Sequence, residues 1–261
     1  MKLEVEKIEF AYASGHDVLK DLSLSYETPD VLCILGANGT GKSTLLRCIC
    51  GELKVQKGAI RLEGKNIESF SARERAQKIA YIPQNHVPSF AYSVIDVVTM
   101  GRTAHMSYLA TPSIDDKNRA LDQLNYLGIG NLSEKRYTEI SGGERQLVMI
   151  AAALVQEPLL LILDEPTAHL DFGNQYKFLL LVEKLKKTGI GVLMTTHFPD
   201  HALALQGSTA VLRDASISCR GPALDVITEE AMSNLYDIEV NVRKLGDRHI
   251  CVPGPLEKEE V

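Results

Sequence analysis

The stretch "VLCILGANGTGKST", residues 31–44, decides the fold of this chain. Its first five residues are all apolar and predict a short buried strand. The eight that follow, "GANGTGKS", fit the pattern GxxxxGK[ST], and helical sequence begins near Gly41. Strand, glycine-rich loop and helix in this order are the context in which the pattern forms a phosphate-binding loop.

The residue types of this loop suit a nucleotide with its Mg²⁺. Glycines let the backbone wrap closely around phosphates. The Lys42 ammonium can reach the β- and γ-phosphates, and the Ser43 hydroxyl can hold Mg²⁺. We therefore predict that ATP and Mg²⁺ bind here. The residues of this candidate nucleotide site are Gly36, Asn38, Gly39, Thr40, Gly41, Lys42, Ser43 and Thr44.

A second apolar run ends in two adjacent acids. Residues 160–163 read "LLIL", and Asp164 and Glu165 follow directly. Ligands of parallel sheets bind at the carboxyl ends of such buried strands. Because two adjacent acids cannot bind one metal equally, we expect different roles for them. Asp164 would bind Mg²⁺ through its water shell, and Glu165 would polarise the attacking water.

A third motif, "ISGGERQ" at residues 140–146, opens another helix. Ser141, Gly142 and Gly143 stand at the helix start, where free backbone N–H groups can point at an anion. The motif lies in a block, residues 85–157, whose segments have helical spacing. It therefore cannot easily share one site with residues 36–43 of the same chain.

Outside this block, buried strands alternate with helices. Short strands at 58–62 and 79–82 flank a helix that Ser71 can cap, and a further helix is expected near residues 228–238. Such alternation predicts an α/β domain with a largely parallel sheet. We expect a catalytic core of residues 1–84 and 158–261, with residues 85–157 inserted as a helical subdomain.

Composition and charge exclude several classes of protein. The net charge of −6 argues against binding nucleic acid through a basic surface. The longest apolar runs are far shorter than the ~20 residues of a membrane helix. Five cysteines without a CxxC pair argue against a disulfide framework or a metal site, and Cys33, Cys48 and Cys50 are expected as small buried apolar residues. We expect a reducing, cytosolic compartment, with docking onto a membrane protein left open.

The phosphate loop, "ISGGERQ", "LLILDEP" and the "TTH" at residues 195–197 occur in an order and spacing that resemble ABC-type ATPases over nearly the whole chain. The "SGG" motif is the signature of that family. The resemblance implies an α/β fold of a particular kind. This fold is a P-loop NTPase (RecA-like) core with an N-terminal antiparallel β subdomain and an inserted α-helical subdomain. The resemblance also implies that the chain hydrolyses ATP.

The resemblance also implies roles for single residues. Tyr12 would stack on adenine, Gln84 would contact Mg²⁺ and water and relay to the transport partner, and His197 would contact the γ-phosphate. Asp171 would lie in a loop that crosses to a facing subunit. The implied catalytic residues are Glu165, His197, Lys42 and Gln84, and the implied metal ligands are Ser43, Gln84 and Asp164.

In such a family the two glycine motifs are halves of different sites. Two copies face head to tail, and Ser141, Gly142 and Gly143 cap the γ-phosphate held by the partner subunit's Lys42. The resemblance therefore implies a homodimer that buries two ATP molecules, each shared between chains. ATP binding would favour closure and hydrolysis would release it.

Two looser patterns point to a branch of the family. Residues 100–116 resemble the "GRxPH…PS..D" insert of ATPases that power import of iron-siderophore, haem and cobalamin, and residues 221–240 resemble the tail "GPxxEVLTEExLxxLYGVxV". This branch implies a separate polytopic permease that inserts a helix at residues 85–110, an extracytoplasmic binding protein, and a peripheral place on the cytoplasmic face of the inner membrane. The departures from the usual pattern are Ala104 for proline, Ala152 for arginine, Ala215 for glycine and Glu144 for glutamine.

Three other functions compete with import. A soluble ABC ATPase in an assembly process, such as iron–sulfur cluster biogenesis, would bind soluble partners instead of a membrane protein. A DNA-repair ABC ATPase would carry long coiled-coil insertions, which this sequence lacks. Glu165 and His197 argue against a nucleotide switch that does not hydrolyse ATP.

Overall fold

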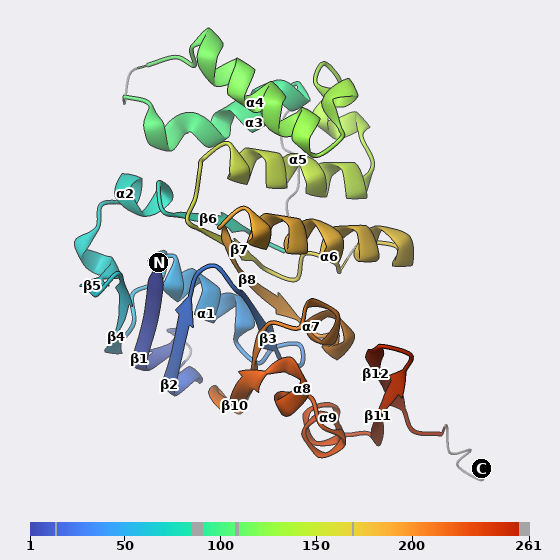
Figure 1. Ribbon diagram of the computed structural model, residues 1–261. Helices are drawn as coiled ribbons and strands as arrows, with labels where there is room; N and C mark the ends of the chain where they lie inside the picture. The colour runs from blue at the N-terminus through green and yellow to red at the C-terminus, as the bar shows by residue number, and fades with distance from the viewer. Residues whose placement is uncertain (14, 85–90, 108–109, 169, 256–261) are drawn as a thin grey trace.

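The computed structural model describes residues 1–13, 15–84, 91–107, 110–168 and 170–255 (Figure 1). Within these ranges the strands form a six-stranded sheet, a four-stranded sheet and a two-stranded hairpin. Of the segment 85–110, where a permease helix was expected, residues 85–90 and 108–109 lie outside the described residues. None of the described helices combines the length and the apolar character that crossing a bilayer needs.

The six-stranded sheet has the order β10-β9-β3-β8-β7-β6. All neighbouring pairs are parallel except β9 with β10. The carboxyl ends of β3, β8 and β7 therefore lie side by side at one edge, which is where the glycine loop and the acid pair begin. The strands are β3 (Val31–Leu35), β6 (Ile79–Ile82), β7 (Leu160–Leu163), β8 (Gly191–Thr196), β9 (Ser208–Arg213) and β10 (Ser216–Pro222).

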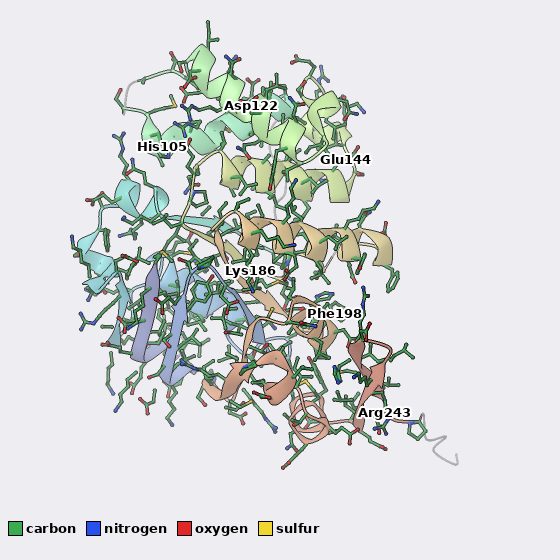
Figure 2. The ribbon with its side chains drawn as sticks, in the orientation of Figure 1. His105, Asp122, Glu144, Lys186, Phe198 and Arg243 are labelled. Carbon is green, nitrogen blue, oxygen red and sulfur yellow. The ribbon has the colours of Figure 1, made fainter. Side chains whose placement is uncertain are left out.

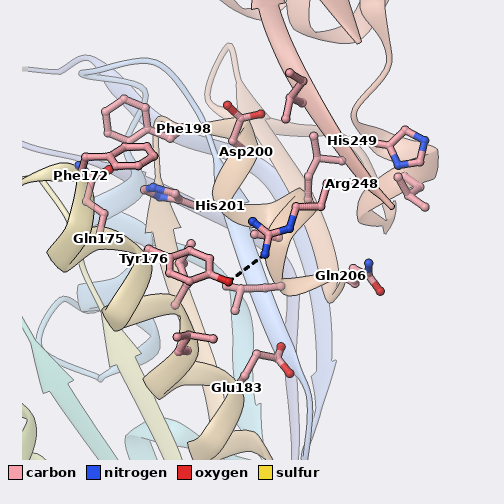
Figure 3. Close-up of a pocket in the computed structure, with 17 residues that line it drawn as sticks. Phe172, Gln175, Tyr176, Glu183, Phe198, Asp200, His201, Gln206, Arg248 and His249 are labelled. Carbon is pink, nitrogen blue, oxygen red and sulfur yellow. Dashed lines mark hydrogen bonds between the residues drawn. The ribbon is translucent and has the colours of Figure 1, made fainter. Parts of the chain in front are cut away.

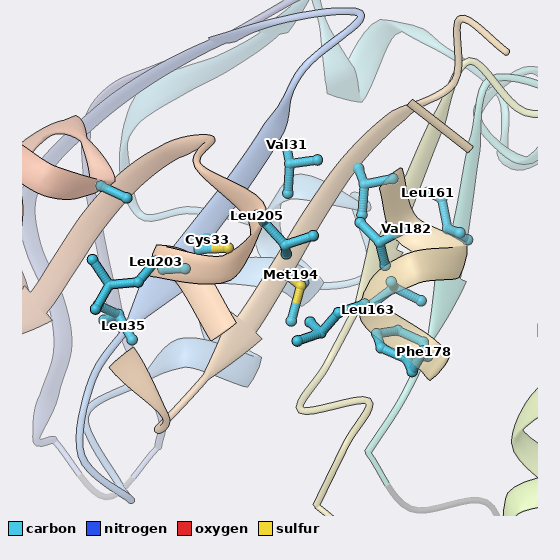
Figure 4. Packing of buried hydrophobic residues seen from close by; sticks show 14 of the residues in the cluster. Val31, Cys33, Leu35, Leu161, Leu163, Phe178, Val182, Met194, Leu203 and Leu205 are labelled. Carbon is cyan, nitrogen blue, oxygen red and sulfur yellow. The ribbon is translucent and has the colours of Figure 1, made fainter. Parts of the chain in front are cut away.

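The central strand β3 is buried on both faces, as its continuous apolar run predicts. Val31, Cys33 and Leu35 face a core formed with the C-terminal helices (Figure 4). Leu32 and Ile34 face the opposite core, which contains the first helix and the N-terminal sheet. Successive side chains point to opposite faces of a strand, so the one run supplies both cores. The prediction of a buried strand at this place is confirmed.

The N-terminal sheet is antiparallel and has the order β2-β1-β4-β5. In β2 apolar and polar residues alternate from Leu22 to Glu27, and the apolar ones of this stretch are buried. They pack with α1 (Lys42–Ile49) against the second face of the large sheet. The antiparallel β subdomain is thus present. Its strands are β1 (Lys2–Ala11), β2 (Asp17–Glu27), β4 (Lys57–Leu62) and β5 (Lys65–Asn66).

A group of helices lies between β6 and β7 in the chain and forms the top of Figure 1. It has its own core, to which α5 contributes Val148 and Ala151, while Ile150 of the same helix packs into the core of the large sheet. Serine side chains cap the starts of the three α-helices of this group. The predicted cap by Ser71 is also confirmed, on a short helix that precedes β6. The elements of this group are α3 (Val94–Met100), η2 (Gly101–His105), α4 (Ile114–Tyr126), η3 (Gly130–Leu132), η4 (Tyr137–Glu139) and α5 (Gly142–Leu154). Two short elements, η1 (Ile67–Ser69) and α2 (Ala72–Ala76), lie earlier in the chain, between β5 and β6.

The last part of the chain covers the other face of the large sheet and ends in a hairpin (Figure 1). The predicted helix near residues 228–238 is confirmed as α9. All five cysteines are free, and Cys50 is half-buried where burial was expected. The elements are α6 (Phe172–Lys187), α7 (Pro199–Leu205), α8 (Ala223–Val226), α9 (Glu229–Tyr236), β11 (Val240–Leu245) and β12 (Arg248–Pro253).

The turn between β9 and β10 shows why the family pattern has glycine where this chain has Ala215. Asp214 and Ala215 have φ values of +49° and +64°, so both lie in the left-handed region. Two-residue hairpin turns of this kind favour glycine, because a Cβ atom is strained there by about 1 kcal/mol. Ala215 occupies the turn despite this strain, and its carbonyl accepts a 2.8 Å hydrogen bond from the N–H of Lys20.

Candidate functional site

The phosphate loop requires glycine at two positions for steric reasons. A Cβ on Gly36 would lie 2.7 Å from Thr40 Oγ1 and 2.8 Å from the Leu212 carbonyl oxygen. Gly41 has φ +99°, and its Cβ would lie 2.8 Å from the Val18 carbonyl oxygen. The loop thus packs tightly against its neighbours. The helix α1 begins directly after it, with backbone N–H groups free at the helix start.

Lys42, the first residue of α1, is buried and folds back over the loop. Its Nζ donates to the carbonyl oxygens of Gly36 at 2.8 Å and Ala37 at 2.9 Å. The same nitrogen lies 3.0 Å from Glu165 Oε1. The cation predicted to reach the phosphates is therefore aimed at the edge of the sheet where the acids lie.

Asp164 and Glu165 follow β7 and are both buried. Thr195, at the end of β8, joins them through one hydroxyl, which donates to Asp164 Oδ1 at 2.7 Å and accepts from the Glu165 N–H at 2.8 Å. Tyr81 OH donates to Asp164 Oδ2 at 3.4 Å. The two adjacent acids thus have different surroundings, and the different roles expected for them stay predictions.

The Glu165 carboxylate is the centre of the site. Its Oε2 accepts from Gln84 Nε2 at 3.1 Å and lies 3.2 Å from His197 Nδ1. With Lys42 on Oε1, the four residues expected to be catalytic meet at one carboxylate. Glu165 also has φ +45°, an unfavourable conformation that functional sites often hold.

Tyr12 lies at the rim of the same loop. Its ring is 42% exposed and stands edge-on to Phe10, with ring centroids 5.0 Å apart. Its hydroxyl is 3.1 Å from Thr44 Oγ1, inside α1. The structure thus fixes an exposed aromatic face next to the phosphate loop, a surface on which a planar base can stack.

The "ISGGERQ" motif forms the start of α5, well apart from the Glu165 carboxylate. Ser141 caps the helix, and its N–H and hydroxyl donate to Glu144 Oε2 at 2.8 and 2.7 Å. These bonds lower the pKa of the Glu144 carboxyl. Figure 2 shows Glu144 in the helical part and Phe198, the residue after His197, in the α/β part. The structure does not bring the two glycine motifs of one chain together.

Asp171 lies near this motif in the same chain. It caps α6, and its carboxylate accepts from the Asn174 N–H at 2.8 Å and from Asn174 Nδ2 at 2.9 Å. A Cβ on Gly143 would stand 3.5 Å from that same Nδ2. Ser141, Gly142 and Asp171 are exposed, so two adjacent loops present a polar surface that faces away from their own core.

Sequence reasoning missed several residues that hold the site in place. Thr195 is fully buried between the two acids, as described above. His201 Nδ1 lies 3.1 Å from Thr196 Oγ1 and 3.4 Å from Thr167 Oγ1, and burial lowers the pKa of His201 to about 4. The signal that could have found the threonines is two hydroxyl residues at the end of an otherwise apolar strand.

The segment that points to a branch of the family forms a buried polar link. Arg102 donates to the Val155 carbonyl oxygen at 2.9 Å and to Asp116 Oδ1 at 3.1 Å. His105 Nε2 lies 2.8 Å from the Gln156 carbonyl oxygen. Hydrogen bonds from Ser113 lower the pKa of Asp116 to about 2. The arginine, histidine and aspartate of the pattern therefore join η2 and α4 to the end of α5.

The helices η2 and α5 also pack closely against each other next to these hydrogen bonds. A Cβ on Gly101 would lie 2.0 Å from the Ala152 carbonyl oxygen, so η2 passes α5 at a distance that only glycine allows. Ala104, which replaces the usual proline, accepts hydrogen bonds from Arg73 and Gln77 through its carbonyl oxygen. A proline carbonyl accepts equally well, so this departure leaves the contact with α2 unchanged.

Comparison with known proteins gives one family. The family described as "ABC transporter" matches residues 19–168. An ABC transporter ATP-binding protein of Haemophilus influenzae is 38% identical over 90% of this chain and 89% of its own length. A molybdate import ATP-binding protein of the same organism is 34% identical over 90% of this chain and 88% of its own length. An iron chelatin transport ATP-binding protein of Helicobacter pylori is 35% identical over 91% and 93%.

A solved structure described as a metal-chelate type ABC transporter, in an inward-facing conformation, superposes on nearly the whole chain. The TM-score is 0.86 with 32% sequence identity, over 98% of this chain and 98% of the other. The fold expected from the motifs is thereby confirmed.

Proposed function

The chain belongs to the ABC transporter family of ATP-hydrolysing, nucleotide-binding subunits, and from this membership we propose that it powers an importer of metal chelates such as iron-siderophore, haem or cobalamin. The observation that carries the hydrolytic part is the convergence of Lys42, Gln84 and His197 on the buried Glu165 carboxylate. The structural likeness to a metal-chelate type transporter supports the import part.

We propose that ATP hydrolysis here works by positioning and charge neutralisation. Phosphoryl transfer needs little covalent chemistry from the protein. Lys42 and His197 neutralise the γ-phosphate, and Glu165 orients and polarises water for in-line attack. Tyr12 stacks on the adenine, and the loop Gly36, Asn38, Gly39, Thr40, Gly41, Ser43 and Thr44 holds the phosphates.

The oxygen donors at the site fit Mg²⁺. This ion prefers hard oxygen ligands and binds through one or two side chains together with substrate phosphates. The exposed Ser43 hydroxyl, the Asp164 carboxylate and the Gln84 amide oxygen are the donors that would hold it. When bound, Mg²⁺ would supply positive charge against the phosphates.

The two adjacent exposed loops support a head-to-tail homodimer. Ser141, Gly142 and Gly143 cap the γ-phosphate bound to the partner subunit's Lys42, and Asp171 reaches across the same interface. In this arrangement residues 85–157 act as the inserted helical subdomain, and residues 1–84 with 158–261 act as the catalytic core. Closure of the dimer on ATP then converts hydrolysis into motion.

The hydrogen bonds that join η2, α4 and the end of α5 support the proposal that this part of the chain couples to a permease. Arg102 lies within segment 85–110, the place proposed to receive a helix from a polytopic permease, and its ion pair with Asp116 ties that segment to α4. The permease would take its cargo from an extracytoplasmic binding protein, with this subunit peripheral on the cytoplasmic face of the membrane. One relative is named for molybdate import, so oxyanions belong in any test of the cargo.

Growth and uptake by cells that lack this chain test the import function. We expect loss of uptake for one substrate among ferric siderophore, haem, cobalamin and molybdate, rescued by the wild-type chain but not by Glu165→Gln. The rescued complex should purify with a polytopic membrane protein. Unchanged uptake of all four substrates, together with a stable complex containing only soluble partners, would favour a role in assembly and overturn the importer proposal.

A further inference from the structure

The peptide group between His197 and Phe198 is held by hydrogen bonds at both its N–H and its carbonyl oxygen. The N–H of Phe198 donates to Thr196 Oγ1 at 3.0 Å. The His197 carbonyl oxygen accepts a 2.8 Å hydrogen bond from Tyr236 OH. Tyr236 stands 39 residues further along the chain, on α9, outside every motif assigned to the nucleotide site. This hydrogen bond thus connects the C-terminal part of the chain directly to the proposed catalytic histidine.

The helix that carries Tyr236 is firmly seated. Met232 and Leu235 are buried in the core of the large sheet, and the Thr228 side chain caps the start of the helix. Asp237, with φ +54°, ends the helix immediately after the tyrosine. The tail pattern of the importer branch has glycine at this position, which suits the same left-handed conformation. Tyr236 therefore projects from a fixed point at the last turn.

The C-terminal hairpin makes a second contact with the segment that follows His197. The N–H of Cys251 on β12 donates to Asp200 Oδ1 at 2.8 Å, and the hairpin is joined to α9 by the Val240 N–H, which donates to Ser233 Oγ at 2.9 Å. α9 and the hairpin thus hold residues 197–200 at two points.

Beside this contact the hairpin borders a cavity of about 490 Å³ between itself, α6 and α7 (Figure 3). Arg248 spans it and donates to Tyr176 OH at 2.8 Å. On the side away from the cavity the hairpin packs with α9, because Val240 is buried in the same apolar core as Met232 and Leu235. Of the two, α9 carries the side chain that bonds directly to the His197 main chain.

We propose that Tyr236 is a positioning residue for ATP hydrolysis, which holds the His197 carbonyl so that the imidazole keeps its place against Glu165; this role rests on the function proposed above for His197. Burial raises the pKa of the Tyr236 hydroxyl, so the hydroxyl stays a hydrogen-bond donor well above neutral pH. A small displacement of a catalytic group is enough to slow a reaction severely. Phosphate binding by the loop and Lys42 does not use this hydrogen bond.

The variant Tyr236→Phe tests the proposal, because it deletes one oxygen and keeps the ring. We expect kcat for ATP hydrolysis to fall about five- to fiftyfold, with KM for ATP changed less than about twofold. Tyr26→Phe is the matched control. Tyr26 OH also donates to a backbone carbonyl, that of Asp30, but at the opposite end of the sheet from His197. The control variant should lose similar stability in urea unfolding and keep the wild-type kcat.

Three outcomes separate this proposal from the one on which it rests. If Tyr236→Phe and Tyr26→Phe have the same kcat, or if kcat and KM change together in Tyr236→Phe, Tyr236 has no positioning role. If His197→Ala is inactive while Tyr236→Phe matches the wild type, only the role of Tyr236 is overturned. If His197→Ala hydrolyses ATP normally, the role proposed for His197 fails, and the role of Tyr236 with it.

Discussion

Lys42 Nζ and Glu165 Oε1 lie 3.0 Å apart, with both side chains almost fully buried. Each neutralises a charge that would be costly alone, because an unpaired buried ion loses several kcal/mol of hydration. The phosphates of ATP carry the same sign of charge as Glu165 and need the same cation. Nucleotide binding therefore competes with this ion pair, and the first predictions concern that competition.

Glu165→Gln should bind ATP more tightly and hydrolyse it far more slowly. The neutral amide competes less for Lys42 and no longer repels the γ-phosphate, but it cannot polarise water. We expect the Kd for ATP to fall several-fold and phosphate release to fall at least about a hundredfold. Glu52→Gln, at an exposed pair with Arg47, is the control and should match the wild type. Undiminished phosphate release would remove Glu165 from the mechanism.

Lys42→Ala should destabilise the protein more than the double variant Lys42→Ala with Glu165→Gln. The single change leaves the Glu165 carboxylate buried without its cation, at a cost of about 3–5 kcal/mol. The second change removes the orphaned charge and should restore part of the loss. Urea unfolding of the wild type, both single variants and the double variant measures the coupling. Additive losses would show that the pair does not interact in solution.

Thr195→Val should lower both stability and ATP hydrolysis. Valine has nearly the same shape but leaves the Glu165 N–H and Asp164 without their shared hydroxyl, which should cost about 1–3 kcal/mol. Thr209→Val is a matched control on β9, separated from β8 by β3 in the same sheet, because Thr209 Oγ1 is buried and finds no partner among the described residues. That control should be neutral or stabilising. Equal effects of the two changes in urea unfolding would contradict the assigned bond.

Arg102→Ala should loosen the helical part of the chain. It removes a buried guanidinium from Asp116 and from the end of α5, so we expect a loss of about 3 kcal/mol. Arg119, an exposed arginine that pairs with Asp115 and Glu157, is the comparison, and its change to alanine should cost less than about 1 kcal/mol. Amide hydrogen exchange in α4 should rise in the first variant only.

His201 should make stability depend on pH. Burial, aided by the charge of His197, lowers its pKa from 6.5 to about 4. Below the unfolded-state value the unfolded chain takes up a proton that the folded chain refuses, so the free energy of unfolding falls as pH drops from about 6.5 to about 4.

His201→Gln provides the measurement. The glutamine lacks this titration, so the stability difference between wild type and variant should shrink between about pH 7.5 and about pH 4.5 in urea unfolding. Changing the exposed His16 to glutamine should leave the wild-type pH dependence intact. A difference that stays constant with pH would show that His201 is not held neutral.

The parts of the fold that sequence could predict are those whose cause is local. The apolar run of β3, the glycine loop and the Ser71 cap each depend on a few adjacent residues, and each is present as expected. Family resemblance supplied residues from distant strands, and the structure brings Gln84, Glu165 and His197 together. Their roles in catalysis stay predictions until the variants are measured.

The remaining features depend on contacts between residues far apart in the chain. Nothing near Tyr236 in the sequence indicates that its hydroxyl donates to the His197 carbonyl oxygen. The residues around Thr195 likewise do not indicate that its hydroxyl bonds both the Asp164 carboxylate and the Glu165 N–H. Arg102 belonged to a recognised pattern, yet only the folded chain shows that it binds both Asp116 and the end of α5. Such bonds follow from strand order and helix packing, which single positions do not encode.

The strand order has a consequence for how the protein is made. β3 is synthesised early, but its two neighbours in the sheet are β8 (Gly191–Thr196) and β9 (Ser208–Arg213). On the ribosome it must wait with both edges unpaired until most of the polypeptide has emerged, a condition that favours chaperone binding or aggregation. A chain truncated before β8 would hold the phosphate loop after β3 and the acid pair after β7, but it would lack the strand that lies between them in the sheet. Premature termination should therefore yield inactive, rapidly degraded fragments.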